Sequence, residues 1–137
     1  MNCSNFTLLF ADDEPAIRAI YQKSFVPDGF KVVLCENADQ VLEKLGQQKL
    51  DLLVLDLQMP GMDRMDLFAI LREKYSAIPA LVVSGVYSGV VEDFTAKGYD
   101  TITFFNKPAS LLELKKSIFE ILKIDALGAF LGDKEVG

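Results

Sequence analysis

Carboxylates stand at the ends of two apolar runs in this chain. The run "FTLLFA" leads directly into Asp12 and Asp13, and the run "LLVLD" ends in Asp56. Charged side chains at the end of a buried segment are uncommon unless they are paired, bound to a metal or used chemically. These three aspartates are therefore the first candidates for a functional site.

Two further polar groups follow the later apolar runs. "LVVSG" ends in Ser84 and Gly85, and "TITFFNKP" leads to Lys107. If all these runs are parallel strands of one sheet, the polar residues gather at its carboxyl edge, where α/β folds place their sites. Negative charges a few Å apart repel strongly unless a cation lies among them.

The residue types at this edge predict a particular chemistry. The chain has no histidine, which excludes imidazole metal sites and favours oxygen-ligated Mg²⁺, Mn²⁺ or Ca²⁺. A carboxylate beside such an ion can attack phosphorus and form an aspartyl phosphate. Asp56 is the best-placed nucleophile, Asp12 and Asp13 the metal ligands, Ser84 a hydroxyl donor and Lys107 an ion-pair partner for the phosphoryl group.

The elements that position these residues alternate along the chain. Strands are predicted at residues 6–11, 31–35, 51–56, 79–84 and 101–105, and helices at 14–25, 38–45 with Gly46 as the stop, 65–75, about 87–97, and 111–122. Such alternation predicts an α/β fold, a doubly wound parallel sheet with helices on both faces.

Length and charge limit the other functions. The 137 residues suffice for one domain. The net charge of −6 leaves no basic excess for phosphate backbones, so we expect no direct nucleic-acid binding. No apolar stretch is long enough for a membrane span, and the two cysteines fit a reducing compartment, so we expect a cytoplasmic protein. Lys115 and Lys116 are expected on a solvated helix face.

Four segments together resemble a known family. "FADDEP", "LDLQMPGMD", "LVVSG" and "FFNKP" look like the signature segments of the receiver domain of bacterial two-component response regulators, in order and at matching separations. The resemblance implies the flavodoxin-like (βα)5 receiver fold, with five strands in the order 2-1-3-4-5. It implies a receiver domain over residues 1–124, with 125–137 as a helix extension or linker.

The resemblance also implies roles for individual residues. Asp56 matches the phosphoacceptor, which takes a phosphoryl group from the phosphohistidine of a sensor histidine kinase or a histidine phosphotransfer protein. Asp13 matches the direct Mg²⁺ (or Mn²⁺) ligand and Asp12 a more water-mediated one, and the backbone carbonyl of Gln58 completes the set. The backbone at Gln58 and Gly85 would bind the phosphoryl group.

The remaining matches concern the switch. Ser84 matches the switch hydroxyl, Phe104 the switch aromatic, and Lys107 the lysine that precedes a proline. Phosphorylation would change the surface made by the helix near 87–97, the strand 101–105 and the helix 111–122. That surface would recruit an output domain or protein, or form a homodimer. The only enzymatic activities implied are self-phosphorylation from a phosphodonor and autodephosphorylation, so the chain is not expected to be a conventional enzyme.

Other interpretations stay open at this point. Asp12 and Asp13 alone would also suit the start of a helix, and Phe104 would suit a core. An aspartate-nucleophile phosphohydrolase would need a second acid where Gln58 stands. A degenerate receiver would bind partners without phosphorylation.

Three positions depart from the family pattern. Arg64 stands where the family usually has Gly, which disfavours positive φ there and predicts a reshaped loop or an earlier helix start. Gln58 and Val86 stand at positions that, in the family, tune the access of water to the phosphoryl group. An apolar Val86 is unsuited to positioning an attacking water, which predicts a long-lived phosphoryl state.

Overall fold

The computed structural model describes residues 5–56, 64–84, 102–106 and 110–122, with β5 and the end of β4 described by their backbone. The elements follow the predicted alternation closely. They are β1 (Thr7–Ala11), α1 (Pro15–Phe25), a 3₁₀ turn (Val26–Asp28), β2 (Lys31–Cys35), α2 (Ala38–Gln47), β3 (Leu52–Asp56), α3 (Arg64–Lys74), β4 (Ala80–Ser84), β5 (Ile102–Asn106) and α5 (Leu111–Leu122). The helix predicted near 87–97 lies outside the described residues.

The strands form a single parallel sheet. Their order is β2-β1-β3-β4-β5, which confirms the order implied by the resemblance. β1 lies between β2 and β3, with Leu9 paired to Val33 on one side and to Leu53 on the other. Parallel neighbours require crossover connections, and α1, α2 and α3 supply those between the strands from β1 to β4.

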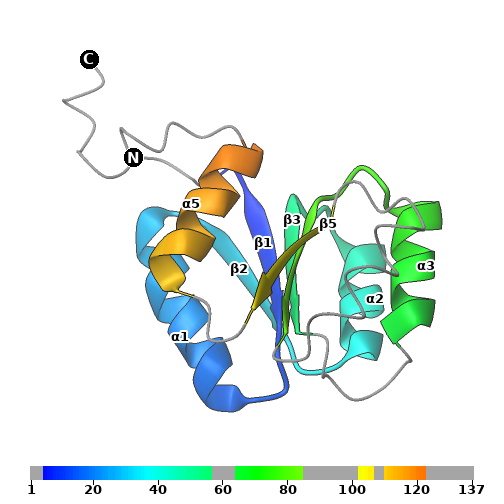
Figure 1. Ribbon diagram of the computed structural model, residues 1–137, viewed down its shortest axis with the longest axis horizontal. Coiled ribbons are helices and arrows are strands. Elements are labelled where there is room, and N and C mark those ends of the chain that lie inside the picture. Colours follow the sequence, from blue (N-terminus) through cyan, green and yellow to red (C-terminus); the bar gives the residue numbers. More distant parts are fainter. Residues whose placement is uncertain (1–4, 57–63, 85–101, 107–109, 123–137) are drawn as a thin grey trace.

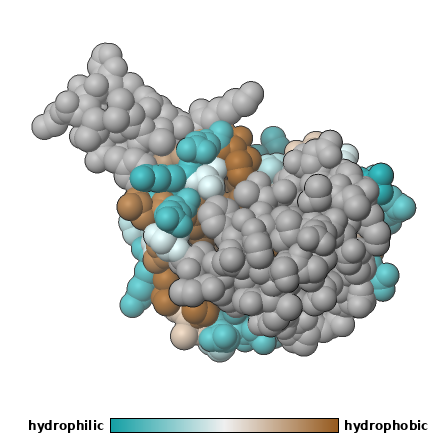
Figure 2. Space-filling model, in the orientation of Figure 1, coloured by the Kyte–Doolittle hydropathy of each residue, from teal (hydrophilic) through white to brown (hydrophobic). Residues whose placement is uncertain are grey.

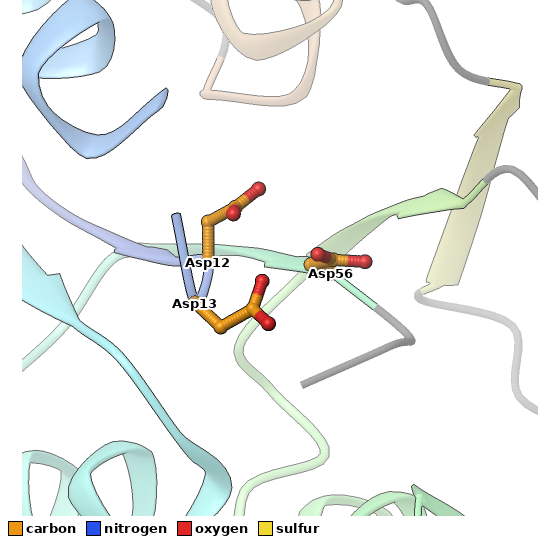
Figure 3. Close-up of side chains that lie close together, drawn as sticks. All are labelled: Asp12, Asp13 and Asp56. Carbon is orange, nitrogen blue, oxygen red and sulfur yellow. The ribbon is translucent and has the colours of Figure 1, made fainter. Parts of the chain in front are cut away.

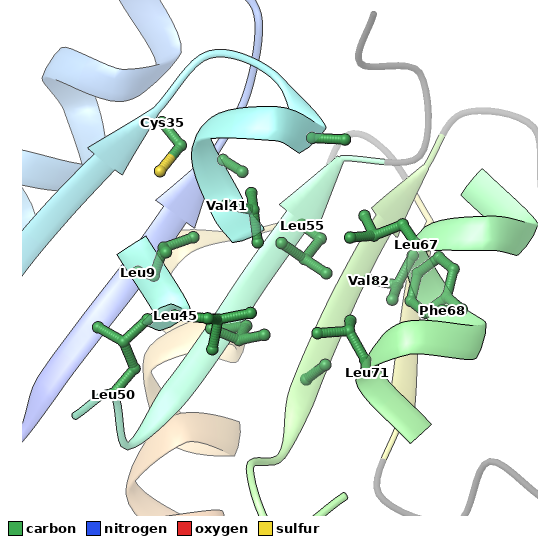
Figure 4. Close-up of a cluster of buried hydrophobic side chains, with 14 residues drawn as sticks. Leu9, Cys35, Val41, Leu45, Leu50, Leu55, Leu67, Phe68, Leu71 and Val82 are labelled. Atoms are coloured by element: carbon green, nitrogen blue, oxygen red, sulfur yellow. The ribbon is translucent and has the colours of Figure 1, made fainter. Parts of the chain in front are cut away.

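Alternate side chains of the described strands build two separate cores, one on each face of the sheet, and helices cover both faces (Figure 1). α2 and α3 cover one face of the sheet, where Leu9, Leu53 and Leu55 meet Val41 and Phe68, among others (Figure 4). α1 and α5 cover the other face, where the buried residues are Leu8, Phe10, Tyr21, Phe25, Phe30, Leu52, Val54, Leu81, Val83, Leu114, Ile118 and Phe119. Every side chain of β3 is buried, as expected for a strand covered on both faces.

An aromatic cluster joins the elements on the α1 and α5 face. The rings of Phe10 and Tyr21 stack with their centroids 4.5 Å apart, and Phe25 lies 4.9 Å from Phe10. Phe30 then links Phe25 to Phe119 at 5.8 and 6.0 Å. These contacts attach the two helices to each other and to β1.

Two glycines behave differently from each other. Gly29 follows the 3₁₀ turn with φ of 101°, a left-handed conformation that glycine adopts without strain. The prediction that Gly46 stops α2 is wrong, because the helix runs through Gly46 to Gln47. It ends instead where Gln48 turns to an extended backbone with φ of −153°.

The described surface is mixed in character. On the side where α1 and α5 lie, hydrophilic and hydrophobic residues alternate (Figure 2). The exposed large apolar side chains are Ile20, Val26, Leu111 and Leu112. None of the described helices has both the length and the apolar composition needed to cross a bilayer.

Candidate functional site

The three predicted aspartates meet at the carboxyl edge of the sheet. Ala11 of β1 is paired with Leu55 of β3, so the next residues, Asp12 just after β1 and Asp56 at the end of β3, lie side by side. Asp13 follows in the turn that leads into α1. The central position of β1 and β3 therefore brings together carboxylates that are far apart in the sequence.

The carboxylates are close enough to share one cation. One oxygen from each of Asp12, Asp13 and Asp56 lies within 4.8 Å of the other two, and the three side chains border a common space (Figure 3). Asp12 and Asp56 are 2% and 5% exposed, whereas Asp13 is exposed. Two buried anions and one accessible anion, all with hard oxygen donors, fit a divalent ion such as Mg²⁺ that keeps part of its water shell.

The turn that carries Asp12 and Asp13 is held by several hydrogen bonds. The backbone N–H of Asp12 donates to the carbonyl of Cys35 at 3.0 Å, and the N–H of Glu14 donates to Asp12 Oδ1 at 2.9 Å. The N-cap residue of α1 is Glu14, which makes no side-chain capping bond. Asp12 thus stabilises the turn before α1 but is not the N-cap of the helix. Its second oxygen, Oδ2, takes no part in the hydrogen bond from Glu14.

The negative charge of the site extends to a buried neighbour. Tyr21 is 8% exposed, and burial, followed by the charges of Asp12 and Asp56, raises the pKa of Tyr21 from 10.0 to about 12. A phenol that stays neutral at any ordinary pH adds no further negative charge here. The sequence pattern alone did not indicate this electrostatic contact between Tyr21 and the aspartates.

A second residue missed by sequence reasoning is Arg18. Its Nη1 donates to the carbonyl oxygen of Asp12 at 2.7 Å, and its Nη2 lies 3.7 Å from Glu36 Oε2. The signal available in the sequence was an arginine six residues after Asp12, one helical turn into α1.

The other predicted site residues are described only in part. Ser84 is the last residue of β4 and Phe104 the middle residue of β5, and Ser84 is paired with Asn106. The backbone of Ser84 therefore lies at the same edge of the sheet as Asp56, which is paired with Val83. Lys107, Gln58 and Gly85 lie outside the described residues, as does Val86. Arg64 is the first residue of α3 in the described structure. A helical backbone is right-handed, so this position does not require glycine.

Comparison with known proteins decides the family. The family model for the response regulator receiver domain matches residues 8–119. The chain belongs to the receiver domains of response regulators. These domains are parts of two-component signalling systems, and the match covers every element from β1 into α5.

Curated relatives of this receiver domain are transcriptional regulators. It is 34% identical over 109 residues to the transcriptional activator protein PfeR of Pseudomonas aeruginosa, covering 78% of this chain and 34% of PfeR. It is 27% identical over 119 residues to the transcriptional regulatory protein GlrR of Escherichia coli, covering 87% of this chain and 27% of GlrR. The chain thus spans about a third or less of the length of these relatives.

Solved structures share the receiver fold. A response regulator receiver domain from Francisella superposes with a TM-score of 0.76 at 24% identity, covering 87% of this chain and 98% of that one. TrrA of Thermotoga maritima, solved in complex with Mg²⁺-BeF, superposes with a TM-score of 0.70 at 25% identity, covering 85% and 98%.

Proposed function

We propose that this receiver domain is a phosphorylation-controlled switch in which Asp56 accepts a phosphoryl group in the presence of Mg²⁺. The observation that carries the proposal is the cluster of Asp12, Asp13 and Asp56, whose carboxylate oxygens lie within 4.8 Å of one another. Such a cluster is costly without a cation, and Asp56 is its member at the end of the central strand.

The proposed transfer needs few parts from the protein. An oxygen of Asp56 attacks the phosphorus of a phosphohistidine, the phosphorus–nitrogen bond breaks, and its electron pair remains on the imidazole of the donor. Asp12, Asp13 and the backbone carbonyl of Gln58 would hold the Mg²⁺, or Mn²⁺ in its place. When bound, the ion supplies positive charge that offsets the charge of the transferred oxygens. The TrrA complex with Mg²⁺-BeF supports this choice of ion.

The proposal gives the remaining site residues supporting roles. Lys107 would pair with the phosphoryl group, and the backbone at Gln58 and Gly85 would donate hydrogen bonds to it. The hydroxyl of Ser84 would donate a hydrogen bond to the phosphoryl group, and Phe104 would turn inward when that hydroxyl moves. New contacts made only in the phosphorylated state shift the population between two states. With Val86 apolar, we expect the phosphoryl group to be long-lived.

The proposed partners follow from the same chemistry. The donor would be a sensor histidine kinase or a histidine phosphotransfer protein, because the chain contains no histidine of its own. The output would be a domain or a separate protein that contacts the surface made by the helix predicted near 87–97, β5 and α5, or a second copy of the chain on that surface. We propose residues 1–124 as the receiver domain and 125–137 as a helix extension or linker. Neither nucleic acid nor a membrane is a proposed partner.

A cytoplasmic location completes the proposal. Cys35 is a free, buried cysteine, and burial raises the pKa of its thiol from 9.0 to about 11. A reduced, unpaired thiol of this kind is typical of proteins in a reducing compartment such as the cytoplasm.

A small phosphodonor tests the proposal directly. The protein is incubated with acetyl phosphate, with and without Mg²⁺, and its intact mass is followed. We expect one phosphoryl adduct that forms only with the metal. An adduct that forms equally well in EDTA would contradict the proposed site, and no adduct under any condition would favour a receiver that binds partners without phosphorylation.

A further inference from the structure

Arg18 connects the acidic turn to the neighbouring turn of the sheet edge. Its Nη1 donates to the carbonyl oxygen of Asp12 at 2.7 Å, a short, charge-assisted hydrogen bond. Its Nη2 lies 3.7 Å from Glu36 Oε2, and the Arg18 side chain is only 17% exposed. The Arg18 side chain thus reaches back over the start of α1 to the end of β1.

The acceptor of this bond matters for the site. The carbonyl of Asp12 belongs to the peptide unit that joins Asp12 to Asp13. Both carboxylates of the turn project from the two ends of this unit. A bond that fixes the orientation of the carbonyl therefore restrains the directions from which the two carboxylates reach the cation site.

The other partner of Arg18 is itself well anchored. Glu36 lies between β2 and α2, where its N–H donates to Gln40 Oε1 at 2.8 Å. The Gln40 N–H in turn donates to Asn37 Oδ1, the N-cap of α2. Glu36 is 55% exposed, and an exposed ion pair of this length contributes little by itself. Its value is to hold the guanidinium in the orientation that the bond to Asp12 requires.

We propose that Arg18 is a positioning residue for the divalent cation site, which it serves by orienting the Asp12–Asp13 peptide unit. This inference rests on the proposed function, since it concerns the same site. The positioning role and a purely electrostatic role predict opposite changes in Mg²⁺ affinity when Arg18 is removed. Removing a positive charge near three carboxylates should strengthen cation binding if charge alone matters, whereas removing a positioning bond should weaken it.

The test is a calorimetric titration of each variant with MgCl₂. Arg18→Met is expected to bind Mg²⁺ about tenfold more weakly than wild type, the usual scale for losing an outer-shell partner. Arg18→Lys keeps the charge and one donor and is expected to recover part of the affinity. The matched control is Lys23→Met, which removes a positive charge from an exposed position of the same helix and should leave the affinity within about twofold, because exposed charges are screened.

A second readout separates positioning from general damage. Acetyl phosphate labelling measured against Mg²⁺ concentration should show a higher half-saturating Mg²⁺ concentration for Arg18→Met, with a near-normal rate at saturation. Thermal unfolding in EDTA establishes that each variant is folded. If Arg18→Met does not fold, Arg18→Lys is compared with Lys23→Met instead. A weaker Mg²⁺ affinity in Arg18→Lys would support the positioning role, and an equal affinity would contradict it.

The outcomes are distinguishable. If wild type binds Mg²⁺ and forms the adduct while Arg18→Met binds Mg²⁺ as tightly or more tightly, the positioning role is wrong and the proposed function stands. If wild type binds Mg²⁺ but forms no adduct, the proposed function is wrong and the titrations still decide the role of Arg18. If wild type binds no Mg²⁺, the cation site and the inference are both wrong. A weaker affinity in Arg18→Met with intact folding supports the inference.

Discussion

The ammonium group of Lys115 lies 2.7 Å from the carboxylate of Asp28, which fastens α5 to the turn that follows α1. The same Nζ donates to the carbonyl of Ser24 at 3.0 Å and lies 5.1 Å from the centre of the Phe25 ring. Lys115 therefore satisfies a carbonyl in the last turn of another helix, and the prediction that it lies on a solvated face is wrong. Lys116 is exposed, as predicted.

The two adjacent lysines make a matched pair for measuring this contact. Lys115→Met is expected to lower the free energy of unfolding by about 1–2 kcal/mol, because it removes a partly buried, charge-assisted hydrogen bond and leaves Asp28 without this cation. Lys116→Met should change it by less than about 0.5 kcal/mol, as is usual at exposed positions. Urea unfolding followed by circular dichroism provides both numbers. Equal effects at the two positions would show that the Lys115 contacts do not persist in solution.

Charge repulsion within the acidic cluster predicts that neutralising one member stabilises the metal-free fold. In EDTA, Asp56→Asn is expected to raise the free energy of unfolding by about 1–3 kcal/mol. This is the repulsion, at the effective dielectric constants found in proteins, between carboxylates whose oxygens lie within 4.8 Å of one another. In a domain of this size that corresponds to roughly 3 to 10 degrees in the melting temperature.

Added Mg²⁺ should reverse the comparison. Wild type gains stability with rising Mg²⁺ by mass action, whereas Asp56→Asn, with one anionic ligand fewer, gains less. Differential scanning fluorimetry across a MgCl₂ series measures both effects, with NaCl at matched ionic strength as the control. A wild-type melting temperature that responds no more to Mg²⁺ than to matched ionic strength would contradict a divalent site.

Alkaline pH is expected to destabilise the fold through two buried groups. The pKa of Cys35 is raised from 9.0 to about 11 and that of Tyr21 from 10.0 to about 12. The folded chain therefore keeps these protons at pH values where the unfolded chain has lost them. The stability they provide is complete below pH 9 and declines from about pH 9 to 11 for Cys35, and from about pH 10 to 12 for Tyr21.

The variant Tyr21→Phe isolates one part of this effect. Each group contributes a maximum slope of about 1.4 kcal/mol per pH unit, so the stability of wild type should fall more steeply than that of Tyr21→Phe above pH 10. Urea unfolding at pH 8, 9, 10 and 11 gives the two slopes. Parallel curves for the two proteins would mean that Tyr21 titrates normally in the fold.

Much of the fold was predictable because its signals are local. Apolar runs such as residues 52–55 mark buried strands, and the helical spacing of residues such as Val41 and Leu45 marks the faces that pack on the sheet. Asp12, Asp13 and Asp56 could be found because a charge at the mouth of a buried strand stands out against its neighbours. The strand order came from the resemblance, since local pattern does not specify which strands are adjacent.

What the sequence left out depends on contacts between distant residues. Nothing near Lys115 in the sequence indicates that it reaches the end of α1, and the place of Arg18 six residues after Asp12 does not by itself specify a bond to the Asp12 carbonyl. Gly46 was expected to stop α2, but no local rule compels a helix to end at glycine. The helix runs on to Gln47, and the chain turns at Gln48 before Leu50, which is buried just ahead of β3.

Asp56 is expected to carry the phosphoryl group, and peptide-level mass spectrometry after acetyl phosphate labelling can locate that group on the chain. Wild type, Asp56→Asn and the control Asp51→Asn are compared in Mg²⁺. Asp51 lies just before the opposite end of β3, where its carboxylate accepts a hydrogen bond from Thr7, a bond that asparagine can also accept. We predict one phosphoryl group in wild type and in Asp51→Asn, located on the peptide that contains Asp56, and none in Asp56→Asn. A phosphoryl group that persists in folded Asp56→Asn would contradict the account.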